Sequence, residues 1–139
     1  MDIQELSEKA QCMLSEGSSF LLSTIDRNGF PGMIVVSAPI IRHGMYSLKF
    51  YIDGEGETAQ NVENNSMGSV CCFKEEAKES LLLKGCFTIH EIEDYKVIED
   101  KLAEYQKELN HKYPVIISFE TLAVKIHSGR QTRAAELDE

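Results

Sequence analysis

The sequence is short of positive charge. Its 14 Lys and Arg residues stand against 23 Asp and Glu residues, so the formal net charge is −9 at pH 7. Nucleic acids and anionic membranes are bound by proteins that present a positive field. The charge therefore argues against a nucleic-acid partner and against a membrane-surface partner. It also makes a phosphorylated ligand harder to accommodate.

Long hydrophobic runs are missing as well, because no run of 18 or more apolar residues is present. This predicts that the protein has no transmembrane helix. The first five residues are acidic and polar, so no secretory signal is expected. The four cysteines are Cys12, Cys71, Cys72 and Cys86. None of them forms a C-x-x-C pair, and we expect reduced cysteines in a cytoplasmic protein.

Sequence motifs of several enzyme classes are absent. There is no P-loop, no G-x-G-x-x-G fingerprint and no G-x-S-x-G nucleophile elbow. The four histidines are His43, His90, His111 and His127. No two of them have the H-x-H or H-x-x-x-H spacing of metal ligands, so we predict no metal site. No side chain stands out as a catalytic acid, base or nucleophile.

The apolar residues that are present predict a mainly β protein. An amphipathic helix is expected over residues 2–16, ended by Gly17 in a left-handed conformation. Strands are expected over residues 18–25, 33–41, 46–53, 68–73, 81–92 and 115–127. Asn28-Gly29 predicts a tight hairpin turn, and Gly85 predicts a bulge or bend in the fifth strand. The last strand is expected to break near Glu120.

Two more helices and a polar tail complete the expected elements. A short helix is predicted over residues 57–64, and a longer one over residues 95–109 with Asp94 as its cap. The tail from about residue 128 is polar and is expected to be loosely ordered. Hairpins dominate and no repeated βαβ unit occurs, which favours an antiparallel barrel with helices at its ends. We predict one domain over residues 1–139.

Several segments resemble those of a known family. Leu21-Leu22-Ser23-Thr24-Ile25-Asp26 is followed by Asn28-Gly29-Phe30-Pro31, and Ser69-Val70-Cys71-Cys72-Phe73 follows the loop and helix of residues 54–65. This pattern resembles the pyridoxamine 5′-phosphate oxidase-like family of FMN-binding split β-barrels, in particular its small general-stress-protein branch. The resemblance implies an antiparallel split β-barrel and a homodimer with two FMN sites at the subunit interface. It also implies flavin redox chemistry on a small molecule.

The resemblance also implies which positions contact FMN. The expected FMN-binding residues are Val35, Val36, Ser37, Tyr51, Ile52, Asp53, Thr58 and Asn61. In this family an arginine and a lysine usually hold the FMN phosphate, and Ile34 and Thr58 stand at the matching positions here. Gly56 stands where a serine is usual. Both expected cations are therefore missing.

Two interpretations of the loop at residues 54–58 stay open. The start of the short helix offers N–H groups to a phosphate, and the Thr58 hydroxyl and the Asn61 amide add donors. Glu55 and Glu57 oppose this, because a carboxylate close to a phosphate costs free energy. Alternatively, the glycines make a plain turn and Thr58 caps the helix. The candidate replacements for the missing charge, the last two from a partner subunit, are Lys49, Arg42, Arg130 and Arg133.

The first hypothesis is an FMN-binding homodimer, with potential flavin-dependent oxidoreductase activity on an unknown small molecule. Oxidation of pyridoxamine phosphate itself is disfavoured, because a second phosphate would need further cations. The second hypothesis is a non-enzymatic module on the same fold that binds another flat ligand, either a deazaflavin or haem. His90 and His127 are the candidate axial ligands for haem. The third is a structural dimer without a ligand.

Overall fold

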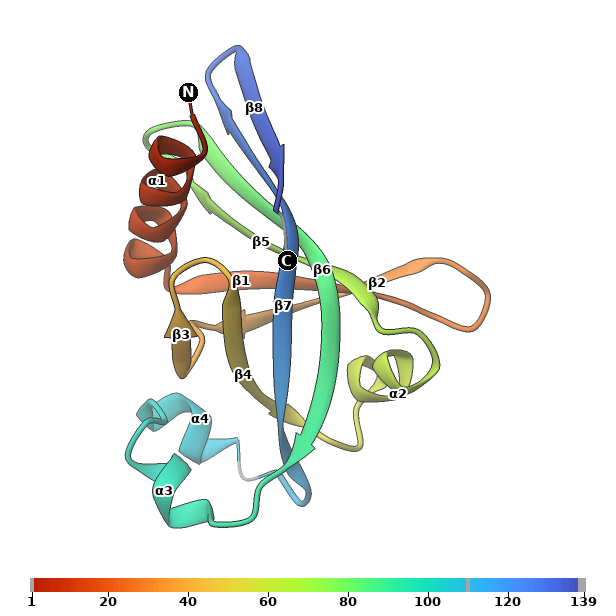
Figure 1. Ribbon diagram of the computed structural model, residues 1–139. Helices are drawn as coiled ribbons and strands as arrows, with labels where there is room; N and C mark the ends of the chain where they lie inside the picture. Colours follow the sequence, from red (N-terminus) through yellow and green to blue (C-terminus); the bar gives the residue numbers. More distant parts are fainter. Residues whose placement is uncertain (1, 110, 138–139) are drawn as a thin grey trace.

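A single antiparallel sheet of eight strands forms the centre of the computed structural model, which describes residues 2–109 and 111–137 (Figure 1). Its strands are β1 Ser19–Ile25, β2 Pro31–Ser37, β3 Ile41–His43, β4 Ser47–Asp53, β5 Met67–Lys74, β6 Glu79–Glu91, β7 Pro114–Ser128 and β8 Gln131–Glu136. The spatial order is β2-β1-β5-β6-β7-β4-β3, and β8 pairs with β7. The sheet is not closed, since β2 and β3 stand at opposite ends of this order. The predicted mainly β, antiparallel class is confirmed.

The first helix, α1 (Ile3–Glu16), packs its apolar stripe against the sheet. Asp2 caps it by accepting a hydrogen bond from the Glu5 amide at 2.9 Å. The helix ends at Gly17 as predicted, but Gly17 has φ −70° and is not left-handed. A Cβ at this position would lie 2.9 Å from Cζ of Phe20. Glycine is therefore suited to this position by lack of space rather than by its backbone angles.

The core lies between the inward face of the curved sheet and the helices. Its largest fully buried side chains include four phenylalanines, and their rings pair across neighbouring elements. Phe87 and Phe119 have centroids 4.8 Å apart, and Phe20 and Phe50 have centroids 6.1 Å apart. Aromatic pairs at these separations add to the stabilisation from buried apolar area.

The predicted bulge at Gly85 is confirmed. The pairing of β6 with β7 shifts between Lys84 and Gly85, and Leu122 is the extra residue on β7. A Cβ at Gly85 would lie 1.9 Å from the Glu120 carbonyl oxygen, so only glycine allows this approach. The expected break near Glu120 is wrong. The bulge absorbs the extra residue, and β7 runs unbroken from Pro114 to Ser128.

Two predicted elements are divided in the structure. The strand expected over residues 33–41 becomes β2 and β3, and the segment between them contains Pro39, which has no N–H to donate to a ladder. The helix expected over residues 95–109 becomes α3 (Tyr95–Glu99) and α4 (Glu104–Glu108). Asp94 caps α3 as predicted, accepting from the Lys96 amide at 3.1 Å. The chain turns between them and buries Leu102 against the sheet.

The expected loose tail is also wrong within the described residues. Residues 131–136 form β8, an edge strand paired with β7 through a turn in which Gly129 has φ +61°. The Leu137 amide continues the ladder with a 2.8 Å hydrogen bond to the Leu122 carbonyl oxygen. Backbone pairing with an open strand edge orders this polar segment despite its few apolar side chains. Residues 138 and 139 lie outside the described residues.

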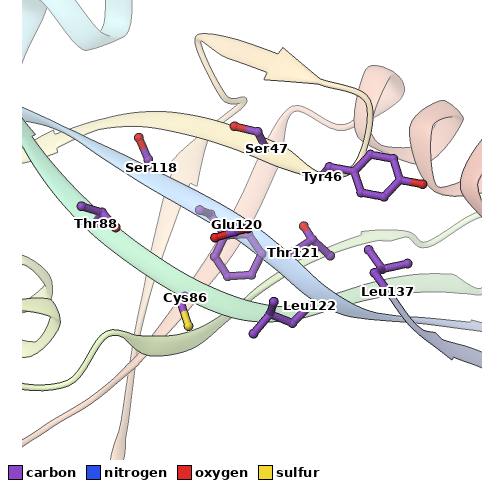
Figure 2. Close-up of a pocket in the computed structure, with 10 residues that line it drawn as sticks. Tyr46, Ser47, Cys86, Thr88, Ser118, Glu120, Thr121, Leu122 and Leu137 are labelled. Atoms are coloured by element: carbon purple, nitrogen blue, oxygen red, sulfur yellow. The ribbon is translucent and has the colours of Figure 1, made fainter. Parts of the chain in front are cut away.

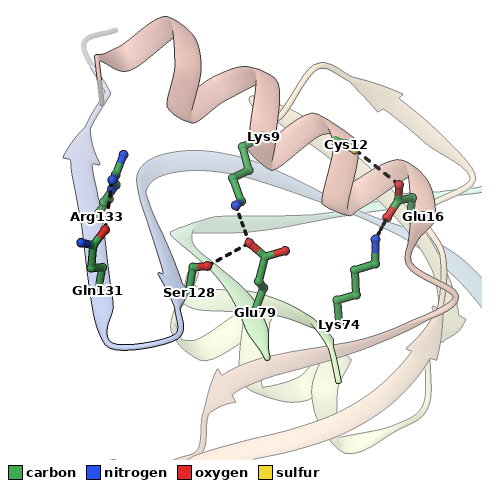
Figure 3. A network of polar contacts seen from close by, with 8 residues as sticks. All are labelled: Lys9, Cys12, Glu16, Lys74, Glu79, Ser128, Gln131 and Arg133. Carbon is green, nitrogen blue, oxygen red and sulfur yellow. Dashed lines mark hydrogen bonds and ion pairs between the residues drawn. The ribbon is translucent and has the colours of Figure 1, made fainter. Parts of the chain in front are cut away.

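A network of polar contacts fastens α1 to the sheet (Figure 3). Lys9 pairs with Glu79, which also accepts a hydrogen bond from the Ser128 hydroxyl at 3.1 Å. Lys74 and Glu16 form a second ion pair at 2.6 Å. Lys9 holds the pKa of Glu79 below its usual value, and Lys74 does the same for Glu16. These contacts join the helix to β5, β6 and β7 at the rim of the core.

Candidate functional site

The loop that was expected to hold a phosphate joins β4 to α2 (Glu57–Asn64). The Gly54 amide donates to the Tyr113 carbonyl oxygen at 2.8 Å, and a Cβ at Gly54 would lie 2.5 Å from that oxygen. Asp53 accepts a hydrogen bond from the Glu55 amide at 3.0 Å. Close packing against Tyr113 therefore accounts for Gly54 without any ligand.

The start of α2 carries no side-chain cap. Gly56 is the N-cap residue, and no side chain accepts from the first amides of the helix. These N–H groups are suitable donors for an anion. The expectation that Thr58 caps the helix is wrong, because Thr58 lies inside the first turn and is buried.

Asn61 is turned into the molecule and is already bonded. Its Nδ2 donates to Oγ1 of Thr24 at 3.0 Å, and both side chains are about 95% or more buried. This bond ties α2 to β1 across the inward face of the sheet. The Asn61 amide is therefore a packing contact within one copy of the chain rather than a free donor to a phosphate.

The expected ring contacts on β4 are buried on opposite faces of that strand. Ile52 belongs to the main core, whereas Tyr51 packs with Leu102 and Ile116 beneath the α3–α4 segment. Burial, together with the neighbouring Tyr95 hydroxyl, raises the pKa of Tyr51 to about 12. Both side chains are thus occupied by packing.

The expected contacts on β2 differ from one residue to the next. Val35 is 68% exposed on the outward face of the sheet, whereas Val36 packs against the core. Ser37 is half-buried at the end of the strand. The structure therefore does not gather the eight predicted residues in one cavity. Within a single copy, they do not fit a complete FMN site.

Within the described part of one copy of the chain, no hydrogen bond or ion pair joins Arg42 or Lys49 to the loop. The Arg42 guanidinium donates to the Gly44 carbonyl oxygen at 2.8 Å and to the Ser15 hydroxyl at 2.7 Å, which holds it beside α1. Arg133 donates to Gln131 at 3.0 Å on β8. The expected roles of Arg130 and Arg133 from a partner subunit stay predictions. None of the hydrogen bonds or ion pairs among the described residues joins Lys49 or Arg130 to residues 54–58.

A cavity of about 720 Å³ borders this loop at one end of the sheet. Its lining combines three carboxylates and one ammonium group, that of Lys112, with two exposed tyrosines, Tyr95 and Tyr113. The carboxylates are those of Glu55, Glu63 and Glu91. No ion pair among the described residues neutralises them. The charge of this cavity opposes a phosphate.

A second cavity, of about 490 Å³, lies on the outward face of β4, β6 and β7 (Figure 2). Hydroxyl groups of Ser47, Thr88 and Ser118 and the Glu120 carboxylate line it. Ser118 Oγ is buried and has no hydrogen-bond partner among the described residues. Sequence reasoning missed this site, because its residues come from strands that are distant in the chain and adjacent in the sheet.

A third cavity, of about 360 Å³, lies on the outward face of β1, β5 and β6. It joins the apolar side chains of Ile25, Met67 and Leu122 to the polar groups of Ser23, Ser69 and Lys84. Lys84 lies on the face of β6 opposite the buried Leu81 and Leu83. The pairing of Lys84 with Ser69 required the sheet register.

No family model matches this sequence, and no curated protein matches it. Solved structures do match. A Clostridium acetobutylicum protein related to general stress protein 26, of the pyridoxinephosphate oxidase family, has TM-score 0.80 and 10% identity over 99% of this chain and 97% of its own. A pyridoxamine 5′-phosphate oxidase-related, FMN binding protein of Nostoc punctiforme has TM-score 0.68 and 10% identity over 100% of this chain and 98% of its own.

A heme binding protein of Mycobacterium smegmatis is also similar, with TM-score 0.74 and 13% identity over 94% of this chain and 57% of its own. At sequence identities of 10% to 13%, the similarity shows a shared fold and nothing more. The chain has the split-barrel fold of the pyridoxamine 5′-phosphate oxidase-like proteins, so the resemblance predicted from the sequence is confirmed for the fold.

Proposed function

We propose that this split-barrel protein binds FMN between two copies of the chain, as a cytoplasmic homodimer with potential oxidoreductase activity. The observation that carries the proposal is the outward face of β2, β1 and β5. Large apolar side chains stay exposed there: Met33 61%, Val35 68%, Met67 61% and Phe73 59%. An exposed apolar face of this kind is typical of an association surface.

The incomplete site within one copy agrees with a ligand held between copies. Val35 and Ser37 lie at the uncovered end strand of the sheet, where a ligand can reach them. Val36, Tyr51, Ile52, Thr58 and Asn61 are packed, so their contribution would be to shape the walls. When bound, the flavin supplies the electron-transfer chemistry. The chain supplies an apolar surface that excludes water. It also supplies hydrogen-bond donors that orient the ligand.

The test is a titration of the purified protein with FMN, followed by flavin fluorescence and the visible spectrum. We expect a shifted spectrum, altered fluorescence and a raised melting temperature, because a ligand that binds only the folded state stabilises it. Light scattering is expected to give the mass of two copies. A spectrum identical to that of free FMN with an unchanged melting temperature would show that FMN does not bind, and a monomer would exclude the dimer.

A haem ligand is the second candidate, favoured by the similar fold of the heme binding protein. His90 is exposed on β6, whereas His127 Nδ1 lies 2.7 Å from the Thr132 hydroxyl. The Thr132 contact leaves Nε2 of His127 free, so both histidines stay candidate axial ligands if haem binds. Haem titration of the His90→Ala and His127→Ala variants tests this, and a Soret band unchanged in both would exclude these two residues as ligands.

A further inference from the structure

Three hydrogen-bond donors lie in a row across the outward face of the sheet. Ser23 of β1 is opposite Ser69 of β5, and Ser69 is opposite Lys84 of β6. Neighbouring strands are about 4.8 Å apart, so the row spans about 10 Å. All three side chains line the same cavity of about 360 Å³. Two hydroxyls and one ammonium group therefore face a common space.

These donors are not used within the fold. No ion pair among the described residues involves Lys84, and no hydrogen bond of the Ser23 or Ser69 hydroxyl to another described residue is found. On the other side of Lys84, the row continues through Ala123 of β7 to Glu136 of β8. The Glu136 carboxylate forms no ion pair with Lys84 among the described residues. The ammonium group is thus available to an anion.

The surroundings of the row are apolar. Ile25, Met67 and Leu122 form the other walls of the cavity. Apolar walls with a few convergent polar groups are typical of sites for small organic ligands. This cavity suits a ligand with an apolar body and an anionic group.

The two candidate places for a phosphate differ in charge. The start of α2 offers backbone N–H groups, but Glu55 and Glu57 flank it. The row on the outward face offers Lys84 and two hydroxyls without a carboxylate among its three members. A charge-assisted hydrogen bond to phosphate is stronger than a neutral one. The outward row is therefore the better phosphate site.

We propose that Lys84, with Ser69 and Ser23, holds the phosphate of the ligand bound between two copies, in place of the arginine and lysine that this chain lacks. The proposal rests on the proposed function, since it concerns the same ligand. It places the phosphate on the outward face of the sheet rather than at α2.

The test compares FMN with riboflavin, which has the same ring and no phosphate. Titrations by flavin fluorescence are made with the wild type and with Lys84→Gln, Lys84→Arg and Lys101→Gln, the last being an exposed lysine in the turn between α3 and α4. We expect Lys84→Gln to weaken FMN binding about fivefold, which corresponds to the upper end of the range for an exposed ion pair. Riboflavin binding is expected to be unchanged, and Lys84→Arg and Lys101→Gln are expected to bind FMN like the wild type.

The Glu57→Gln variant tests the alternative position of the phosphate, at the start of α2. If the phosphate lies at the start of α2, removal of this carboxylate tightens FMN binding; the proposal expects no change. Unaltered FMN binding in Lys84→Gln, or equal losses for FMN and riboflavin, would overturn the proposal while leaving FMN binding itself established. A wild type that binds neither flavin would overturn the proposed function and, with it, this assignment of the phosphate.

Discussion

The two faces of the sheet are built from the same strands and have opposite properties. On β6 the inward residues Leu81, Leu83 and Phe87 are at most 1% exposed. The residues between them, Leu82, Lys84 and Cys86, face outward and line open cavities. The inward face is apolar and closed, whereas the outward face mixes exposed apolar side chains with unpaired polar groups.

This difference separates the needs of folding from the needs of binding. Burial on the inward face accounts for the apolar residues that alternate along each strand. It does not account for Met33, Val35, Met67 and Phe73, which lie on the other face of the sheet or at its rim and stay exposed. Those side chains are exposed rather than part of the core, and they form the association surface that we propose.

The two faces are expected to differ most in how the loss of one phenylalanine ring changes the free energy of unfolding. Phe87→Ala removes a ring that is 99% buried and tilted against Phe119, and we expect a loss of about 3–5 kcal/mol in the free energy of unfolding. Phe73→Ala removes a ring that is 59% exposed, and at protein concentrations where the chain is monomeric we expect a change within about 0.5 kcal/mol. Urea denaturation followed by circular dichroism measures both.

Light scattering of the same two variants sharpens the comparison. If the outward face joins two copies, Phe73→Ala weakens the dimer although the fold of each copy is intact. Similar losses of unfolding free energy for both variants would contradict the division of the sheet into a folding face and a binding face.

A smaller effect is expected for the buried hydrogen bond between Asn61 of α2 and Thr24 of β1. Asn61→Ala leaves Oγ1 of Thr24 without its 3.0 Å partner in a buried place, and we expect a loss of about 1–3 kcal/mol. Thr24→Val removes the other partner, and the double variant Thr24→Val, Asn61→Ala removes both polar groups. Chemical denaturation of the two single variants and the double variant forms a cycle, and additive losses would show that the two side chains do not act as a pair.

The smallest effect is expected at the rim, where Glu79 pairs with Lys9. Because Lys9 holds the pKa of Glu79 below its usual value of 4.5, the contribution to stability is present above that value and disappears as the pH falls through the lowered pKa. Glu79→Gln should therefore lower the melting temperature at neutral pH, and its difference from wild type should vanish in strong acid. Melting curves over a series of pH values check this.

Glu76→Gln is the matched control, because Glu76 is exposed in the turn between β5 and β6. It should leave the melting temperature unaltered at every pH. A difference for Glu79→Gln that stays constant from neutral pH into acid would show that the ion pair does not account for the effect.

Much of the fold was predictable because its causes are local. The alternation along β6, the cap at Asp94 and the turn at Asn28-Gly29 each depend on neighbouring residues, and the structure contains all three. The failures have non-local causes. Residues 131–136 form a strand because β7 offers an open edge, and residues 95–109 do not form one helix because Leu102 is drawn into a cluster with Ile116.

The candidate site was predictable only in part. The sequence predicted the loop at residues 54–58 and the absence of its two cations, and the structure adds that the start of α2 has no side-chain cap. The sequence did not predict that the Asn61 side chain donates a hydrogen bond to Thr24, or that Tyr51 is covered by the α3–α4 segment. Those contacts join residues far apart in the chain.

By itself, the sequence determined the mainly β, antiparallel class, the place of the turn at Asn28-Gly29 and the bulge at Gly85. Each of these follows from side-chain chemistry and spacing along the chain. The absence of two cations near residues 54–58 was implied by the family resemblance. Only the tertiary structure decided which strands are neighbours. That order brings Ser23, Ser69 and Lys84 into one row on the outward face. The physical reason is that strand register depends on long-range hydrogen bonding and on burial of the opposite face, neither of which short-range sequence patterns contain.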